Sequence, residues 1–229
     1  MKIYNLHGWQ VNPAQAREIQ LQLSKEVVPA NTGIEPRLIA GVDISSHGAR
    51  GMARGAIVLV SYPSLKPVEV ETVEAEVTLP YIPGLLSFRE CPIILEACMK
   101  LRNNPDLILV DGQGIAHPRR LGLASHLGLF LNIPTIGCAK SILCGRHGPL
   151  GEEAGSFAEL IDRNEVIGAA LRTRTGVKPV YISIGHKIDL PSALYWAGKC
   201  CRKYRLPEPT RLAHLAAGGN LAFLPDCQV

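Results

Sequence analysis

Three strand-like runs follow one another along this chain before any helical segment separates them, and that order limits the folds it can adopt. The runs cover residues 37–45, 54–62 and 67–79, and the third alternates apolar with acidic residues as a half-exposed strand does. Connections this short join antiparallel neighbours, because a parallel crossover needs a dozen or more residues. The sequence therefore predicts an antiparallel meander and disfavours a purely alternating Rossmann pattern.

Helices and strands then alternate. Apolar spacing predicts a helix at the amino-terminal end and further helices after the meander, over residues 14–28, 87–104, 121–131, 190–205 and 209–218. Short apolar runs predict buried strands over residues 106–112, 133–141 and 179–188, and no element is predicted over residues 145–168. Three antiparallel strands followed by strands added through helices favour an α/β fold, with a ribonuclease-H-like mixed sheet and flanking helices.

Length and composition indicate a single domain over residues 1–229. The hydrophobic fraction of 47% is enough for one sizeable core, and no repeat, low-complexity tract or linker divides the chain. The start of the sequence lacks the basic and then apolar pattern of a secretory signal, and no apolar run is long enough to cross a bilayer. We therefore expect a soluble, cytoplasmic monomer without a membrane partner.

Cysteines and charge give weaker indications. The seven cysteines are scattered without a CxxC pair, so we expect reduced structural thiols, with adjacent Cys200 and Cys201 as one core and one exposed thiol. The formal net charge of +4 suits a polyanionic partner such as nucleic acid but does not require one.

Two carboxylates interrupt apolar strands. Asp43 lies within LIAGVDIS, and Asp111 ends the run LILVD. Burying a lone carboxylate is costly unless a cation accompanies it, and Mg²⁺ prefers hard oxygen ligands. Each residue alone also fits a strand-end turn or cap, and Glu90, at the start of a helix, fits the helix dipole. Together the three predict the acidic cluster of a metal-assisted phosphodiester hydrolase.

The segment after Asp111 reads VDGQGIAHPRRLGLASHLG. Glycines there would let the backbone approach a ligand, and basic residues follow them at His117, Arg119, Arg120 and His126. This density of polar residues at a strand end favours phosphate or base binding over an ordinary loop with a solvated basic edge.

Two further features of the sequence fit either a purely structural role or a role in binding nucleic acid. Lys140 follows a predicted strand, where it would offset charge on a scissile phosphate or simply lie on the surface. The stiff segment PYIPG presents Tyr81 and Ile82, which would wedge between bases or pack on the core. Sequence alone leaves both alternatives open.

Several long segments resemble the motifs of the endonuclease V family, in the family's order and over nearly the whole chain. They are GVDIS, PYIPGLLSFRE, LILVDGQGIAHPRRLGLASHLG, PTIGCAKSILCG, PVYISIGHKIDLPSALYW and PTRLAHLAAG. The resemblance implies a ribonuclease-H-like fold, dependence on Mg²⁺ or Mn²⁺, and hydrolysis of the second phosphodiester bond 3′ to a deoxyinosine in DNA. It also implies that Asp43, Glu90 and Asp111 hold the metal, that Lys140 assists catalysis and that His214 lies near the metal.

The same resemblance implies a lesion pocket. PYIP resembles the family's strand-separating wedge, with Tyr81 at the lesion, and the pocket for the flipped hypoxanthine would be bordered by Gly84, Leu86, Gly112, His117, Gly122 and Gly137. Flipping a base costs a few kcal/mol, least for a mispaired one, which fits a preference for deaminated bases. Ile44, Ser45 and Ser46 stand where the family often carries an aromatic residue, a departure that leaves the three carboxylates in place.

Four other functions stay open at this point. Two are nucleases: another ribonuclease-H-like enzyme, such as a junction resolvase or the nuclease domain of an excision-repair protein, and an endoribonuclease for inosine-containing RNA, since the 2′-hydroxyl need only be tolerated. The third is a non-catalytic nucleic-acid binder. The fourth is a small-molecule phosphate enzyme, disfavoured because the chain carries no P-loop or dinucleotide fingerprint.

Overall fold

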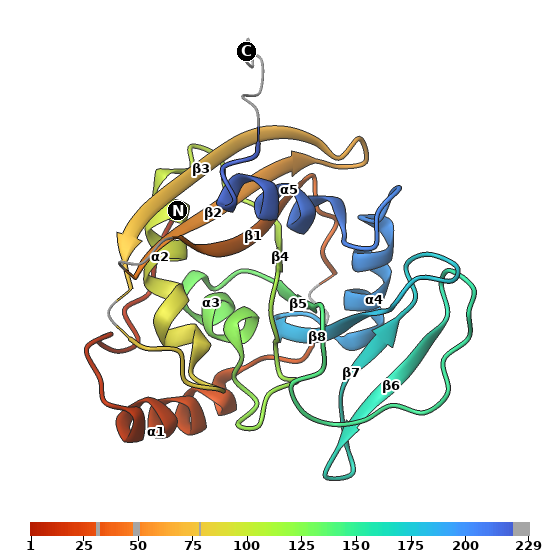
Figure 1. Ribbon diagram of the computed structural model, residues 1–229, viewed down its shortest axis with the longest axis horizontal. Helices are drawn as coiled ribbons and strands as arrows, with labels where there is room; N and C mark the ends of the chain where they lie inside the picture. The colour runs from red at the N-terminus through yellow and green to blue at the C-terminus, as the bar shows by residue number, and fades with distance from the viewer. Residues whose placement is uncertain (31–32, 48–50, 78, 222–229) are drawn as a thin grey trace.

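One mixed sheet forms the centre of the molecule. The computed structural model describes residues 1–30, 33–47, 51–77 and 79–221. Within these residues the sheet has eight strands in the order β3-β2-β1-β4-β5-β8-β7-β6 (Figure 1). The strands are β1 (Leu38–His47), β2 (Met52–Ser61), β3 (Lys66–Glu76), β4 (Leu107–Val110), β5 (Thr135–Ala139), β6 (Phe157–Asp162), β7 (Glu165–Leu171) and β8 (Val180–His186).

The strand pairing follows the predicted order. β1, β2 and β3 form the antiparallel meander, while β4 pairs parallel with both β1 and β5. β8 then runs antiparallel to β5. The predicted α/β fold with a mixed sheet and flanking helices is confirmed.

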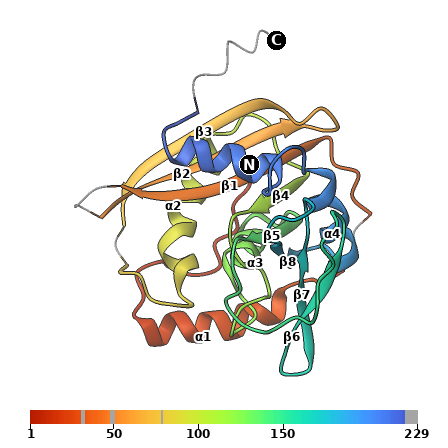
Figure 2. The same cartoon turned by 45° about the vertical axis from the view of Figure 1, so that its right-hand side comes forward.

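Helices cover both faces of this sheet. They are α1 (Pro13–Leu23), the 3₁₀ turn η1 (Ser24–Glu26), α2 (Leu86–Lys100), α3 (Leu123–Leu131), α4 (Leu190–Lys199) and α5 (Glu208–Ala217). Successive strand residues point to opposite faces, so Ile39 packs in the core beneath α4 and α5, while Ala40 packs in the core beneath α2 and α3. Burial on both faces explains why β4 and β5 are continuous apolar runs. Figure 2 shows α1 along the lower edge of the molecule, on the side away from β3.

The hairpin of β6 and β7 is the part of the fold that the sequence did not predict. In β6 only Leu160 is buried, and Phe157 and Ile161 are exposed, so the strand lacks the apolar alternation that marks a half-buried strand. Its turn places Arg163 and Asn164 at positive φ (53° and 63°) without a glycine. A two-residue hairpin turn of this hand is usually signalled by Asn-Gly or Asp-Gly, and the sequence gives no such signal.

Three helices end several residues earlier than predicted, α1, α2 and α4, and α2 stops at Lys100. α1 ends at Leu23 and gives way to η1, after which Val27 is already extended. α4 ends at Lys199, and a hydrogen bond from the Glu208 amide to the Cys200 carbonyl (2.7 Å) turns the chain toward α5.

The cysteines are as expected in the described residues. Cys200 is buried, Cys201 is partly exposed, and none of the described cysteines forms a disulfide. Cys227 lies outside the described residues. In the described part of the chain, every helix is too short or too polar to cross a bilayer.

Candidate active site

Strand register brings two of the predicted carboxylates together. Val42 of β1 lies opposite Val110 of β4, and the Asp111 amide donates to the Val42 carbonyl (3.0 Å). The next residues along, Asp43 and Asp111, are therefore neighbours at the same end of the sheet. By strand parity both side chains belong to the face that α5 covers.

His214 reaches this pair from α5. Its Nδ1 lies 2.7 Å from Oδ2 of Asp43. α5 can lie this close to β1 because Gly41 has no side chain: a Cβ there would fall 2.0 Å from the Pro209 carbonyl oxygen. One ligand atom from each of Asp43, Asp111 and His214 lies within 4.8 Å of the others, an arrangement that could hold a metal ion.

Lys140 lies next to the cluster of Asp43, Asp111 and His214. It follows β5, and its Nζ lies 2.5 Å from Oδ2 of Asp111. That oxygen is buried, and the described residues give it no hydrogen bond of normal geometry, so the close approach of Lys140 is an ion pair without good donor alignment. A buried carboxylate oxygen left in this state has the capacity to bind a cation.

Glu90 lies beside the cluster and is not among the atoms within 4.8 Å of one another. Burial raises its pKa to about 8, and the charges of Asp43 and Asp111 add to the effect while that of Arg89 opposes it. Burial and the charge of Asp111 likewise raise the pKa of Asp43, against the bond from His214. The raised pKa values of Glu90 and Asp43 show that negative charge is crowded here despite the nearby Lys140, and this donor set fits a divalent ion.

A hollow opens next to these residues. It is lined by Tyr81, Gly84, Leu86, Ser87, Gln113, His117, Gly122, Leu123 and Leu143. Five of the predicted pocket residues are therefore brought together here. The two others, Gly112 and Gly137, are not part of the lining; they pack backbone against backbone, and a Cβ on Gly137 would lie 2.5 Å from the Gly114 nitrogen and 2.7 Å from the Gly112 oxygen.

The PYIPG loop has its two apolar side chains on opposite sides. Tyr81 is 67% exposed. Ile82 packs in the small cluster around Ala16, Leu85 and Phe88. Ile82 thus anchors the loop on the core, as the packing interpretation expects, while Tyr81 lies exposed at the edge of the hollow and its role as a wedge stays a prediction.

The basic segment after Asp111 differs from its sequence interpretation. Arg120 bonds the side chains of Asp162 and Glu165, fastening the β6–β7 turn. His126 is buried between Ser87 and His7, 2.9 and 2.7 Å from their polar atoms. These side chains bind other parts of the chain, and only His117 of the four lines the hollow.

Comparison with known proteins decides the family. The family model for Endonuclease V matches residues 21–215. The chain belongs to the endonuclease V family. An endonuclease V of Dehalococcoides mccartyi is 52% identical over 217 residues, which cover 95% of this chain and 97% of that protein.

Solved endonuclease V structures share the fold. That of Streptomyces avermitilis superposes with a TM-score of 0.88 at 40% identity, covering 93% of this chain and 95% of the other. That of Ciona intestinalis, in complex with a 24mer DNA containing an inosine followed by a ribo-adenosine, has a TM-score of 0.80 at 27% identity, covering 91% and 96%. The ribonuclease-H-like fold and the family resemblance are thereby confirmed, and the relatives are nucleases.

Sequence reasoning missed four residues of this endonuclease V hollow: Ser87, Gln113, Leu123 and Leu143. Gln113 stands between two glycines of DGQG, a position that already signalled close ligand approach. Ser87 and Leu123 lie in the first turns of α2 and α3, where the helical apolar spacing predicted packing against the core rather than ligand contact. Leu143 lies in the segment PTIGCAKSILCG, which resembles a family motif, but no predicted strand or helix includes it.

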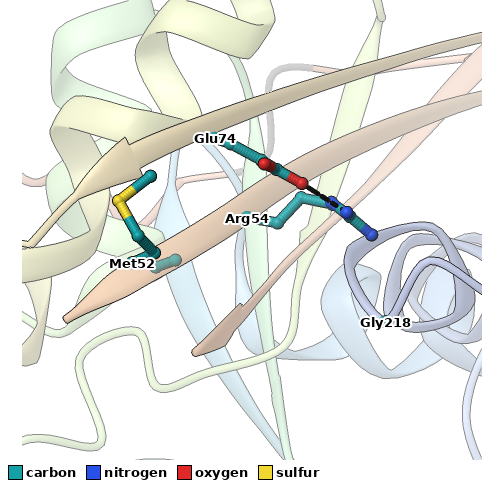
Figure 3. A pocket seen from close by; sticks show the side chains of 5 residues that line it. Met52, Arg54, Glu74 and Gly218 are labelled. Atoms are coloured by element: carbon teal, nitrogen blue, oxygen red, sulfur yellow. Dashed lines mark hydrogen bonds and ion pairs between the residues drawn. The ribbon is translucent and has the colours of Figure 1, made fainter. Parts of the chain in front are cut away.

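A second hollow lies on the outer part of the sheet, and it lacks the features of the first. Met52, Ala53, Arg54, Glu74 and Gly218 line it (Figure 3). Its polar groups are paired, since Arg54 Nε lies 2.7 Å from Glu74 Oε1 and a second bond joins the same two side chains. A satisfied ion pair between half-exposed side chains leaves little for a ligand to gain.

Buried neutral histidines predict an acid-sensitive stability. Burial, with the charge of Lys187, lowers the pKa of His186 to about 4, and burial with that of Arg119 does the same for His117. The unfolded chain binds these protons near pH 6.5, so stability falls as pH drops from about 6.5 toward 4. By linkage each histidine lowers the stability by about 1 to 2 kcal/mol across that window, after allowance for solvent screening.

The prediction is tested at His186, which is remote from the carboxylates. His186→Asn keeps an acceptor for the Val28 amide (3.3 Å in the parent chain) but cannot be protonated. Urea unfolding at pH 7 and pH 5 should show a smaller loss of stability in the variant than in the parent. Equal losses in both proteins would contradict the assignment.

Proposed function

We propose that this chain is a DNA repair endonuclease that nicks a strand at the second phosphodiester bond 3′ to a deoxyinosine. Family membership and the Asp43–Asp111–His214 cluster beside a hollow support this function. The inosine-containing DNA bound by the Ciona intestinalis relative supports the substrate. Other deaminated bases are further substrates under this proposal.

The metal in this proposal is Mg²⁺, with Mn²⁺ as a substitute, held by Asp43, Glu90 and Asp111. When bound, such an ion lowers the pKa of a water and stabilises the charge that builds on the phosphate. The buried Oδ2 of Asp111, which has an ion pair but no hydrogen bond of normal geometry in the described residues, and the raised pKa of Glu90 support this ligand set.

The chain's own side chains have separate tasks. His214 Nδ1 fixes the orientation of the Asp43 carboxylate. Lys140, 41% exposed at its side chain, is placed to offset negative charge on the scissile phosphate. Water attacks the phosphorus in line, the bond to the 3′ oxygen breaks, and that oxygen takes a proton, leaving 3′-hydroxyl and 5′-phosphate ends.

The hollow is the pocket for the flipped base. Tyr81, exposed at its edge, serves as the wedge that replaces the base in the stack. Gly84, Leu86, His117 and Gly122 border the base, and Gly112 and Gly137 keep the adjacent loops in close backbone contact. His117 meets the base as a neutral imidazole, because its pKa is lowered to about 4.

The cleavage position on a duplex with a single inosine tests lesion recognition and chemistry together. With Mg²⁺ we expect one nick at the second phosphodiester bond 3′ to the inosine, none in the matched undamaged duplex, and none after EDTA until Mg²⁺ is returned. Matched inosine RNA and a four-way DNA junction are assayed alongside. Preferred cutting of the RNA would assign an endoribonuclease, and preferred cutting of the junction would assign a resolvase.

A further inference from the structure

Gln20 is a fully buried polar side chain on a surface helix. It lies on α1 with 0% of its surface exposed, although its helix neighbours Arg17, Glu18 and Gln22 are exposed. A buried amide is costly unless its donors and acceptor are bonded. Gln20 meets that condition with bonds to three separate residues.

Those bonds join the two loops that border the lesion pocket. Gln20 Nε2 donates to the carbonyl oxygens of Gly84 (3.0 Å) and Leu121 (3.2 Å). Gly84 itself and Gly122, the neighbour of Leu121, both line the hollow. One amide group therefore ties two segments that border the pocket to each other and to α1, which Figure 2 shows along the lower edge of the molecule.

The Gly84 carbonyl is the focus of the arrangement. Besides Gln20, it accepts from Arg119 Nη2 (2.7 Å) and from His117 Nε2 (3.0 Å). His117 can donate from Nε2 because its Nδ1 accepts from the Arg119 amide (3.1 Å). Arg119 Nε also donates to Gln20 Oε1 (2.6 Å), so the side chains hold one another as well as the carbonyl.

Packing of α1 does not need this amide. Ala16 and Ile19 of the same helix already contact Leu85 and Phe88 in an apolar cluster. An apolar side chain at position 20 would fill the space without the cost of burying polar atoms. The polar contacts therefore serve the position of the loops rather than the docking of the helix.

We propose that Gln20 is a positioning residue that sets the separation of the pocket walls for a flipped purine. This inference rests on the proposed function, since it assigns the hollow to the base. Gly84 is at φ 78°, one of the many conformations open to glycine, so the hydrogen bonds to its carbonyl help to fix the loop in place. Loss of the Gln20 bonds should loosen the fit around the base and leave the carboxylate cluster, on other elements, unchanged.

Two substitutions separate the contacts. Gln20→Met keeps the shape and removes all polar contacts, whereas Gln20→Glu keeps an acceptor for Arg119 and removes the donors to Gly84 and Leu121. For both we expect KM on the inosine duplex to rise about tenfold, as the loss of one or two hydrogen bonds predicts, with kcat within about twofold of the parent. Gln22→Met, at an exposed position of the same helix, is the matched control and should change neither constant.

Two readouts exclude a merely structural effect. The rise in Tm caused by Mn²⁺ should be the same in the parent and in the Gln20 variants, because the carboxylates are untouched. Arg119→Lys cannot serve both Gln20 and Gly84, so it should raise KM in the same way even where a Gln20 variant folds poorly.

The outcomes distinguish this inference from the proposed function. A parent protein that fails to nick inosine DNA overturns the proposed function. A parent that nicks, with Gln20→Met and Arg119→Lys at the parental KM, overturns the role of Gln20 alone. A fall in kcat that follows a lower Tm, with KM unchanged, also overturns it, because that result describes a folding defect.

Discussion

Asp111→Asn is expected to reduce nicking of an inosine duplex by about 10³-fold or more in the presence of Mg²⁺, because metal catalysis supplies several kcal/mol and each 1.36 kcal/mol is about tenfold in rate. Asparagine has the shape of aspartate but no charge. The change removes the negative charge of a carboxylate whose buried Oδ2 lies 2.5 Å from Lys140 and has no hydrogen bond of normal geometry in the described structure. Single-turnover cleavage is the measurement.

Stability gives this variant a second readout. In the metal-free protein the charge of Asp111 helps to raise the pKa of Asp43, so its removal relieves repulsion. The change also removes the ion pair with Lys140, which offsets this gain, so we expect the Tm of Asp111→Asn without metal to lie close to the parent's, and the rise in Tm on adding Mn²⁺ to disappear. A lost activity with a retained metal response would contradict the ligand role.

Asp106→Asn is the matched control for this experiment. Asp106 lies just before the other end of β4, where one carboxylate oxygen accepts from the Arg37 and Leu38 amides (2.8 and 2.9 Å). The variant keeps an acceptor and lies away from the cluster, so nicking should be unchanged. A comparable loss of activity there would mean that any substitution bordering β4 disables the enzyme.

The strands and their carboxylates could be predicted because their signals are local. β1 and β4 are apolar runs, and each carries one charged residue where burial is costly, so Asp43 and Asp111 were visible before any fold was known. Their meeting follows from parallel pairing of the two strands. Placing Glu90 and His214 around them depends on how α2 and α5 cross the sheet, and helix periodicity says which face is apolar but not where that face docks.

Other parts of the site gave no such signal. Glutamine is a residue type usually found on the exposed face of a helix. Gln20 is buried only because the chain brings the carbonyl groups of Gly84 and Leu121 next to it. Arg120 is of a residue type that often binds phosphate, but here it forms ion pairs with Asp162 and Glu165. These two residues belong to a hairpin that the sequence did not predict, because its first strand lacks apolar alternation. In each case the partner is distant in the sequence, and a local pattern cannot name it.

Gly41 explains how α5 comes to place His214 beside Asp43, and its substitution carries the second large expected effect. A Cβ at this position would lie 2.0 Å from the Pro209 oxygen, 2.1 Å from the Pro209 carbon and 2.6 Å from the Thr210 nitrogen. All three are backbone atoms, so no rotamer change relieves the clash, and Gly41→Ala must move α5 away from β1. We expect a loss of about 3 kcal/mol in unfolding free energy, at the upper end of typical overpacking costs, measured by urea denaturation.

The same displacement should separate His214 from Asp43, which lie 2.7 Å apart in the parent chain, and reduce nicking beyond any loss of folded protein. Gly198→Ala is the control. It lies in α4 with nothing within 4 Å of the added Cβ, and alanine there should leave activity unchanged and add up to about 1 kcal/mol of helix stability.

A double variant tests whether Gly41→Ala reduces activity by moving His214. Once α5 has moved, His214→Ala should cost far less activity in the Gly41→Ala protein than in the parent. Equal costs in the two backgrounds would show that Gly41 does not act through His214.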